Sequence, residues 1–185
     1  MISAGHFRKG TTFLMDGKVY TVVEFQHVKT GRGAAFARTK IKNILTGVIK
    51  DHTFASTEKY ERASIETKDM QYLYNDGDFY YFMDLDTYEQ IPVEENAIED
   101  SLMYLKENDT ATLDFFEGKV FDVTTSNFVE LEVTETEPGL KGDTSSGATK
   151  PATVETGLTL NVPLFVSKED IIKIDTRTGE YVSRL

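Results

Sequence analysis

The chain of 185 residues is 39% hydrophobic and 28% charged, and its formal net charge is −11. This size suits one ordinary domain or a few small ones, and nine Tyr and twelve Phe give more aromatic surface than disordered segments carry. The lack of cysteine excludes disulfides, thiolate catalysis and cysteine-ligated metal sites. Because no apolar run reaches the length of a membrane span and the N-terminus lacks a signal-peptide pattern, we expect a cytoplasmic protein with no membrane partner.

Strand signals follow one another along the chain. Apolar and polar residues alternate between turn residues at 18–25, 34–42, 79–84, 110–116, 119–123, 128–135 and 158–166. Glycine-containing turns that suit hairpins lie at 45–47, 74–77, 116–119 and 176–179. One segment differs: in 93–108, Ile98, Leu102 and Leu105 fall on one helical face, which predicts a helix of two turns or more.

Many short strands with one helix predict an all-β chain of three small β-barrel domains. We place these domains at 1–64, 65–128 and 129–185. The first holds eleven Lys or Arg against five Asp or Glu, the second three against sixteen, and the third six against ten. Positive charge is therefore concentrated in the first third of an acidic protein.

Residues 25–50 hold six Lys or Arg and no Asp or Glu. A stretch of this kind favours contact with RNA or DNA, because a polyanion is bound by clustered cations. The alternative is that the basic strand pair is simply a solvated face. The acidic middle third is expected to face solvent or a basic protein, or to keep the wrong surface off the nucleic acid. The alternative is that it serves solubility alone.

The predicted hairpin loop contains "KTGRG", in which Gly31 and Gly33 flank Arg32. Glycine allows positive φ, so the two glycines would hold Arg32 clear of the barrel at the hairpin tip. A guanidinium is always protonated, so Arg32 can donate hydrogen bonds, pair with phosphate or stack, but cannot act as a general base. The alternative is a turn arginine that only adds solubility.

A second glycine-rich loop spans 138–153. It lacks the Lys-Ser/Thr pair of a phosphate-binding P-loop, so nucleotide hydrolysis is unsupported. Its backbone amides, Asp143 and Thr144 could contact a base edge or a ribose, and the alternative is a flexible hairpin loop.

No catalytic group of residues is apparent. His6, His27 and His52 have no metal-ligand spacing, and the acids accompany no nucleophile motif. We therefore expect no catalytic residue, no metal and no cofactor, and a protein that is not an enzyme.

Several longer stretches carry a resemblance to a known family. They are "FQHVKTGRGAAF", "IETKDMQYLYNDGD", "FMDLDTYEQI", "FVELEVTETEPGLKGDTSSGATKPATVETG", "NVPLFV" and "DTRTGEYVSR". Together they resemble the bacterial elongation factor P family from Met1 to Leu185. The resemblance implies an N-terminal SH3-like (KOW-like) barrel followed by two OB-folds, in an L-shaped arrangement that resembles tRNA.

The resemblance also implies a function. A member of this family would bind the 70S ribosome between the P and E sites and stimulate peptide-bond formation at polyproline stretches by positioning the P-site peptidyl-tRNA. The implied partners are ribosomal RNA and proteins, the peptidyl-tRNA, the mRNA codon in the E site and an enzyme that modifies the tip. A monomer is expected.

Individual residues can be assigned by the same resemblance. Arg32 lies where many members have a modified lysine and one subgroup has an arginine that carries rhamnose, so it would contact the CCA end of peptidyl-tRNA, either rhamnosylated or unmodified. The commonest tip in similar members is "KPGKG", from which Thr30 and Arg32 depart. The tip loop and basic RNA-binding face would comprise Lys29, Thr30, Gly31, Gly33, Arg38, Lys40 and Lys42. The loop that contacts the E-site codon would comprise Gly142, Asp143, Thr144 and Gly147.

Three other functions remain open. A single-strand RNA chaperone of the OB type would explain the barrels, but it would present exposed aromatics on a basic groove, and the second and third segments are acidic. An enzyme that acts on sugars or phosphates would need a clustered acid–base pair. The related elongation-factor-P-like protein is the nearest alternative, and an assay of stalling at proline runs would separate the two.

Overall fold

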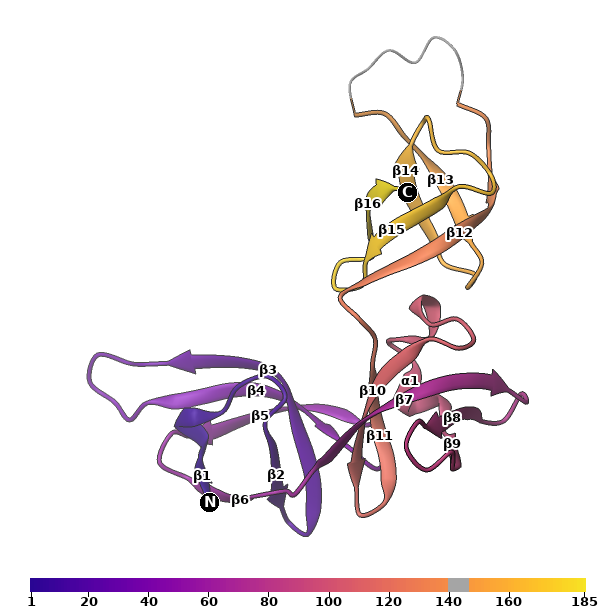
Figure 1. Cartoon of the computed structure of the whole chain (residues 1–185). Helices are drawn as coiled ribbons and strands as arrows, with labels where there is room; N and C mark the ends of the chain where they lie inside the picture. Colours follow the sequence, from indigo (N-terminus) through magenta and orange to yellow (C-terminus); the bar gives the residue numbers. More distant parts are fainter. Residues whose placement is uncertain (140–146) are drawn as a thin grey trace. The chain divides into compact units, whose positions relative to one another are not determined.

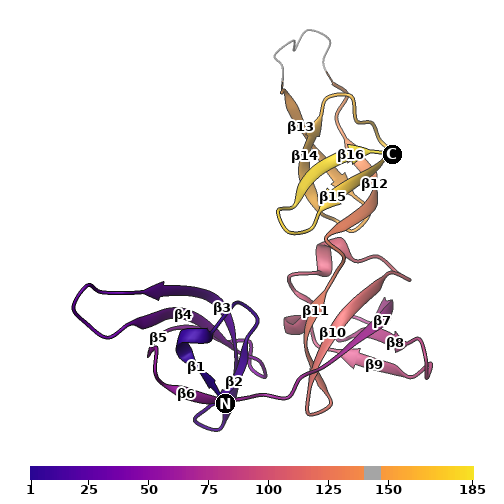
Figure 2. The ribbon, with the colours of Figure 1, turned by 60° about the vertical axis from the view of Figure 1, so that its left-hand side comes forward.

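The computed structural model describes residues 1–139 and 147–185 (Figures 1 and 2). These residues form sixteen β-strands, one four-residue α-helix and two short 3-10 helices, Ala4–His6 and Leu102–Tyr104. The all-β prediction is therefore confirmed. No helix within the described ranges has the length and apolar character of a membrane span.

The first sheet has the strand order β1-β6-β2-β3-β4-β5. Its strands are β1 (Ile2–Ser3), β2 (Thr12–Met15), β3 (Lys18–Val28), β4 (Phe36–Asn43), β5 (Ile49–Ala55) and β6 (Lys59–Arg62). The sheet closes over an aromatic core, in which the rings of Phe7 and Phe13 stack with centroids 4.6 Å apart and Phe54 packs edge-on to both. The β3–β4 hairpin projects beyond the other strands of this sheet (Figure 1).

The second sheet has the order β11-β10-β7-β8-β9. Its strands are β7 (Glu66–Asn75), β8 (Tyr80–Asp84), β9 (Gln90–Val93), β10 (Thr110–Phe116) and β11 (Lys119–Thr124). Between β9 and β10 the predicted helix at 93–108 is wrong in length: only α1 (Glu95–Ile98) and one 3-10 helix form. Acids four residues apart, such as Glu95 and Glu99, disfavour a longer helix. The buried Ser101 hydroxyl, which donates to the Val123 carbonyl at 2.5 Å, ties the chain down at this point instead.

The third sheet has the order β14-β13-β12-β15-β16. Its strands are β12 (Phe128–Thr136), β13 (Thr149–Val154), β14 (Thr159–Pro163), β15 (Ile171–Asp175) and β16 (Glu180–Arg184). Alternate residues of these strands point inward, as period-two strands require, and form one apolar core that includes Leu131, Val133, Val162, Ile172 and Ile174.

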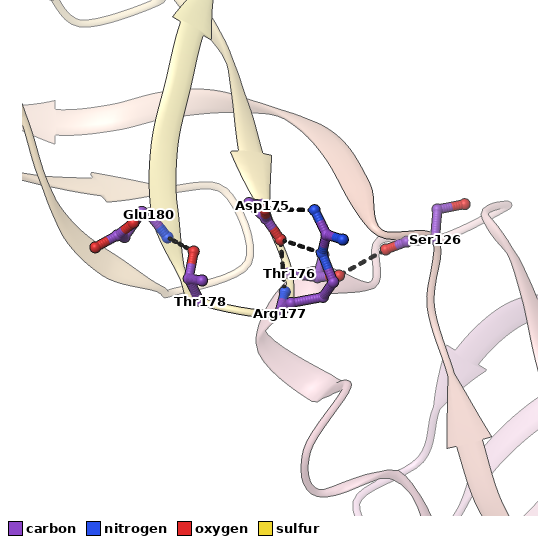
Figure 3. A network of polar contacts seen from close by, with 6 residues as sticks. All are labelled: Ser126, Asp175, Thr176, Arg177, Thr178 and Glu180. Atoms are coloured by element: carbon purple, nitrogen blue, oxygen red, sulfur yellow. Dashed lines mark hydrogen bonds and ion pairs between the residues drawn. The ribbon is translucent and has the colours of Figure 1, made fainter.

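The turn between β15 and β16 is held by its own polar side chains (Figure 3). The Asp175 carboxylate accepts hydrogen bonds from the backbone N–H, Nε and a terminal nitrogen of Arg177, at 2.9, 3.0 and 2.8 Å. These bonds keep the pKa of Asp175 below its ordinary value. The Thr176 hydroxyl donates to the Ser126 carbonyl at 2.7 Å, so the turn is also fastened to the segment that precedes β12.

The chain divides into two compact units. One comprises Met1–Thr67 and Leu113–Asp122, and the other comprises Lys68–Thr112 and Val123–Leu185. Within the first unit, Phe121 of β11 packs with Val19 of β3 and with Ile44, which follows β4 directly. The domain boundaries at residues 64 and 128 stay predictions.

Candidate nucleic-acid interface

The β3–β4 hairpin presents the first predicted site, and residues 29–35 form its loop (Figure 2). The two strands pair from Tyr20 opposite Asn43 to Val28 opposite Phe36, with a bulge between Val22 and Glu24. In the loop, the Gly33 N–H lies 3.5 Å from the Thr30 carbonyl, which makes a turn with Arg32 at a central position. The structure thus places Arg32 at the exposed tip of the hairpin.

The backbone conformation of the two glycines that flank Arg32 differs from the one expected from the sequence. Neither Gly31 nor Gly33 has a positive φ, so the prediction that they supply left-handed backbone is wrong. A Cβ at Gly33 would lie 2.5 Å from the Thr30 Oγ1, a distance that real Cβ atoms do not show, whereas a Cβ at Gly31 would meet no atom within 4 Å. A Cβ at residue 33 would therefore require the Thr30 hydroxyl to move, whereas Gly31 lies in open space.

The basic side chains of β4 lie on the outward face of the sheet. Strand alternation buries Ala37, Thr39 and Ile41 and leaves Arg38 and Lys40 exposed, with Lys42 half-buried on the same face. Lys29 and Thr30 are exposed in the loop beside Arg32. The structure thus brings the predicted RNA-binding residues onto one hairpin, along its tip and one face.

The basic stretch is free of acids in sequence but not in space. Cross-strand register places Lys40 between Glu24 on β3 and Asp51 on β5. The Lys40 ammonium lies 3.2 Å from the Glu24 carboxylate. Reasoning along the sequence missed both acids because they lie just outside residues 25–50, and because the register that sets them opposite Lys40 includes the bulge in β3.

A hollow of about 330 Å³ lies over these three strands. It is lined by Glu24, Phe25, Gln26, Arg38, Thr39, Lys40, Asp51, His52 and Thr53. Its lining offers cations, carboxylates, an amide and hydroxyls, which suit hydrogen bonding to a polar ligand. No group of three or more His, Asp or Glu that could hold a metal ion occurs in the part of the chain that the structure describes.

The second predicted site lies on the connection between β12 and β13. Gly142, Asp143 and Thr144 lie outside the described residues, whereas Gly147 is exposed with a φ of +90°. At the base of this connection, the buried Lys150 ammonium donates to the Glu137 carbonyl at 2.5 Å. Sequence reasoning missed Lys150, although it occupies an inward position in the alternation of β13.

Comparison with known proteins covers nearly the whole chain. Residues 3–60 match the elongation factor P (EF-P) KOW-like domain, residues 65–123 the EF-P OB domain, and residues 129–184 the elongation factor P C-terminal domain. The first two matches agree with the predicted KOW-like barrel and the first OB-fold.

Full-length relatives give the same result. Elongation factor P of Finegoldia magna is 64% identical over 185 residues, and that of Caldanaerobacter subterraneus subsp. tengcongensis is 58% identical, each match covering 100% of both chains. A solved structure described as eukaryotic translation initiation factor 5A, from Methanococcus jannaschii, shares the fold with a TM-score of 0.52 at 24% identity, over 67% of this chain and 91% of that one. The chain belongs to the elongation factor P family of translation factors.

Proposed function

We propose that this protein binds the ribosome between the P and E sites and stimulates peptide-bond formation at polyproline stretches. The observation that carries the proposal is the exposed Arg32 at the tip of a projecting hairpin, in a chain that belongs to this family. Among the described residues, Arg32 has no carboxylate partner, so its charge is available to a phosphate.

The tip acts by positioning. Proline has a constrained backbone, so the CCA end of peptidyl-tRNA samples unproductive geometries, and holding it in place lowers the entropic part of the barrier. Positioning of about 3 to 4 kcal/mol would raise the rate roughly a few hundredfold. Because a guanidinium cannot accept a proton, Arg32 binds and orients the tRNA, while the ribosome performs the chemistry and the protein itself is not an enzyme.

The remaining partners follow from the same proposal. The basic face of the hairpin would contact peptidyl-tRNA, and Gly142, Asp143, Thr144 and Gly147 would contact the E-site codon. Other surfaces would meet ribosomal RNA and proteins. The protein would work as a cytoplasmic monomer without cofactor or metal.

Substitution of Arg32 tests the proposal. Arg32→Ala is expected to fold normally, with a melting temperature within a degree or two of wild type, because exposed substitutions usually change stability by under about 0.5 kcal/mol. It should lose most of the rescue of a reporter that contains three consecutive prolines. Lys59→Ala, which removes an exposed cation from β6, is the matched control and should retain rescue. Full rescue by Arg32→Ala would contradict the role of the tip.

A second variant separates the two modification states of Arg32. Arg32→Lys keeps the charge but removes the planar fork and any sugar directed to the guanidinium. If the tip works as a rhamnosylated arginine, this variant fails in the native cell about as badly as Arg32→Ala, and the intact mass of the native protein exceeds that of its sequence. A native mass equal to the sequence, with lysine and arginine equally active, would show that charge and reach alone suffice.

A further inference from the structure

The outward face of β3, β4 and β5 carries two rows of side chains with different charge. Cross-strand register places one residue from each strand in each row. The first row is Gln26, Arg38 and Thr53, and the second is Glu24, Lys40 and Asp51. All six side chains are exposed and all line the same hollow. The first row is therefore cationic and the second is anionic.

In the second row, one carboxylate is paired and the other is not. Lys40 lies 3.2 Å from Glu24, so these two charges neutralise each other locally. Among the described residues, the Asp51 carboxylate has no hydrogen bond or ion pair, although it stands directly opposite Lys40. Asp51 is thus an exposed acceptor available to a ligand.

In the first row, Arg38 is available as a donor. No carboxylate stands opposite it, since its neighbours across the sheet are Gln26 and Thr53. Its guanidinium lies 5.7 Å from the ring centroid of Phe36, two residues nearer the tip, which restricts the side chain without occupying its hydrogen-bond donors. Arg38 therefore presents a fork that fits a phosphate.

A site with both a guanidinium and a free carboxylate fits one part of RNA. A phosphate backbone alone would be repelled by Asp51, so the carboxylate is favourable only where the ligand supplies a hydrogen-bond donor beside its phosphate. The ribose 2′-hydroxyl is such a donor, and it is the group that distinguishes RNA from DNA. The hollow of about 330 Å³ is near the lower end of the size range of small-ligand sites, which suits one nucleotide.

We infer that this face is an RNA-specific backbone site, in which Arg38 binds a phosphate and Asp51 accepts a hydrogen bond from a ribose 2′-hydroxyl. The inference rests on the proposed function, because the RNA strand whose CCA end reaches Arg32 at the tip would run along the same β3–β4 hairpin. It assigns to Asp51 a part in recognition that its negative charge would otherwise argue against.

The test compares binding of the full chain to two hairpins of one sequence, an RNA acceptor-stem mimic that ends in CCA and its DNA counterpart. Asp51→Ala is expected to lower the ratio of RNA to DNA affinity about tenfold, by weakening RNA binding while relieving repulsion of DNA. Arg38→Gln is expected to weaken both several-fold by the same factor, because both hairpins carry the phosphate. A 2′-O-methyl RNA, which lacks the donor, should bind like DNA.

Matched controls come from β6 in the same sheet. Glu61→Ala removes an exposed acid and Lys59→Gln an exposed cation, and neither is expected to change the affinity ratio. If Asp51→Ala alters RNA and DNA binding by the same factor, or alters neither, the carboxylate does not contact ribose and the inference is wrong. An Arg38→Gln effect no larger than that of Lys59→Gln would overturn the phosphate contact, and failure of the wild-type chain to bind the RNA would overturn both.

These results are distinguishable from failure of the proposed function. The affinity ratio needs no ribosome, so a normal ratio in a protein that does not rescue proline stalling would reject the function and retain the site. If Arg32→Ala loses rescue but Asp51→Ala leaves the affinity ratio unchanged, the proposed function is retained and the ribose site is rejected.

Discussion

A Cβ at Gly33 would meet one neighbouring side chain, that of Thr30. Because a Cβ at this position would lie 2.5 Å from the Thr30 Oγ1, Gly33→Ala must displace either Thr30 or the turn that carries Arg32. We expect this variant to lose proline-stall rescue several-fold while its stability changes by less than about 0.5 kcal/mol, since the loop is exposed. Thermal melting and the triple-proline reporter measure the two quantities.

Two further variants separate local crowding from a general sensitivity of the loop. Thr30→Ala combined with Gly33→Ala removes the Oγ1, and the next atom, the Cβ of residue 30, lies at an ordinary contact distance of 3.7 Å. The double variant should therefore recover the activity of Thr30→Ala alone. Gly31→Ala, with no atom within 4 Å, should leave the turn in place. Equal losses in Gly31→Ala and Gly33→Ala would contradict the steric explanation.

At the scale of elements, β6 joins the aromatic core of the first sheet through Tyr60. Its ring packs against Phe7, Phe13 and Phe54, with centroids 5.2 to 6.1 Å away. Its hydroxyl donates to the Glu58 carboxylate at 2.7 Å. Burial, this hydrogen bond and the nearby negative charges raise the pKa of Tyr60 to about 12.

This pKa predicts a loss of stability in alkali. The raised value means that the folded state holds the proton above pH 10, where the unfolded chain releases it. The contribution is therefore complete below pH 10 and is lost as pH rises toward 12. Because Tyr60 is partly exposed, screening limits the change to roughly 1 kcal/mol or less. Urea unfolding between about pH 9 and about pH 11 should show a smaller decline in Tyr60→Phe than in wild type.

A tyrosine outside the core provides the comparison. Tyr88 is 72% exposed, so Tyr88→Phe is the matched control for loss of a tyrosine hydroxyl outside the core. A constant difference between wild type and Tyr60→Phe across this pH range would show that the β6 tyrosine does not carry the effect.

Elements with strong periodicity could be predicted from sequence, and those set by tertiary contacts could not. The segment 110–116 coincides with β10, and 119–123 falls within β11. Alternation of apolar and polar residues over a short run bounded by turns favours a β-strand. The helix at 93–108 is shorter than its apolar spacing suggests, because crowded acids and the tertiary hydrogen bond of Ser101 act against it. Propensity is a weak signal where such contacts decide.

In the candidate site, too, features set by local sequence could be predicted, and features set by tertiary contacts could not. Arg32 could be placed at the hairpin tip from its local sequence, since glycines and flanking strand signals all lie within a few residues. The pairing of Lys40 with Glu24, and the position of Asp51 opposite it, depend on strand register and on the bulge in β3. A one-residue change of register would turn each side chain to the other face of the sheet. These contacts could therefore not be predicted from the sequence alone.

At the scale of the whole molecule, net charge and local charge have opposite signs. Residues 69–105 contain no Lys or Arg, whereas residues 25–50 contain no Asp or Glu, and the sum of all segments is −11. Association with a polyanion depends on the local field at the contact, so an acidic protein can bind RNA through one basic hairpin. The acids elsewhere then disfavour non-specific binding of an RNA phosphate backbone by other surfaces.

The separation of basic and acidic segments along the chain predicts how RNA binding by the full chain depends on salt. Each cation that contacts a phosphate contributes about 0.7 to 0.9 to the slope of the logarithm of affinity against the logarithm of salt concentration. Lys29→Gln, at the exposed hairpin loop, should reduce the slope by about that amount for the acceptor-stem RNA. Lys168→Gln removes another exposed cation, from the third of the chain that holds six Lys or Arg against ten Asp or Glu, and here the slope should stay unchanged. Titrations at several salt concentrations measure both slopes. A reduction in Lys168→Gln as large as that in Lys29→Gln would mean that RNA also contacts the acidic part of the chain, and local charge would then not select the binding surface.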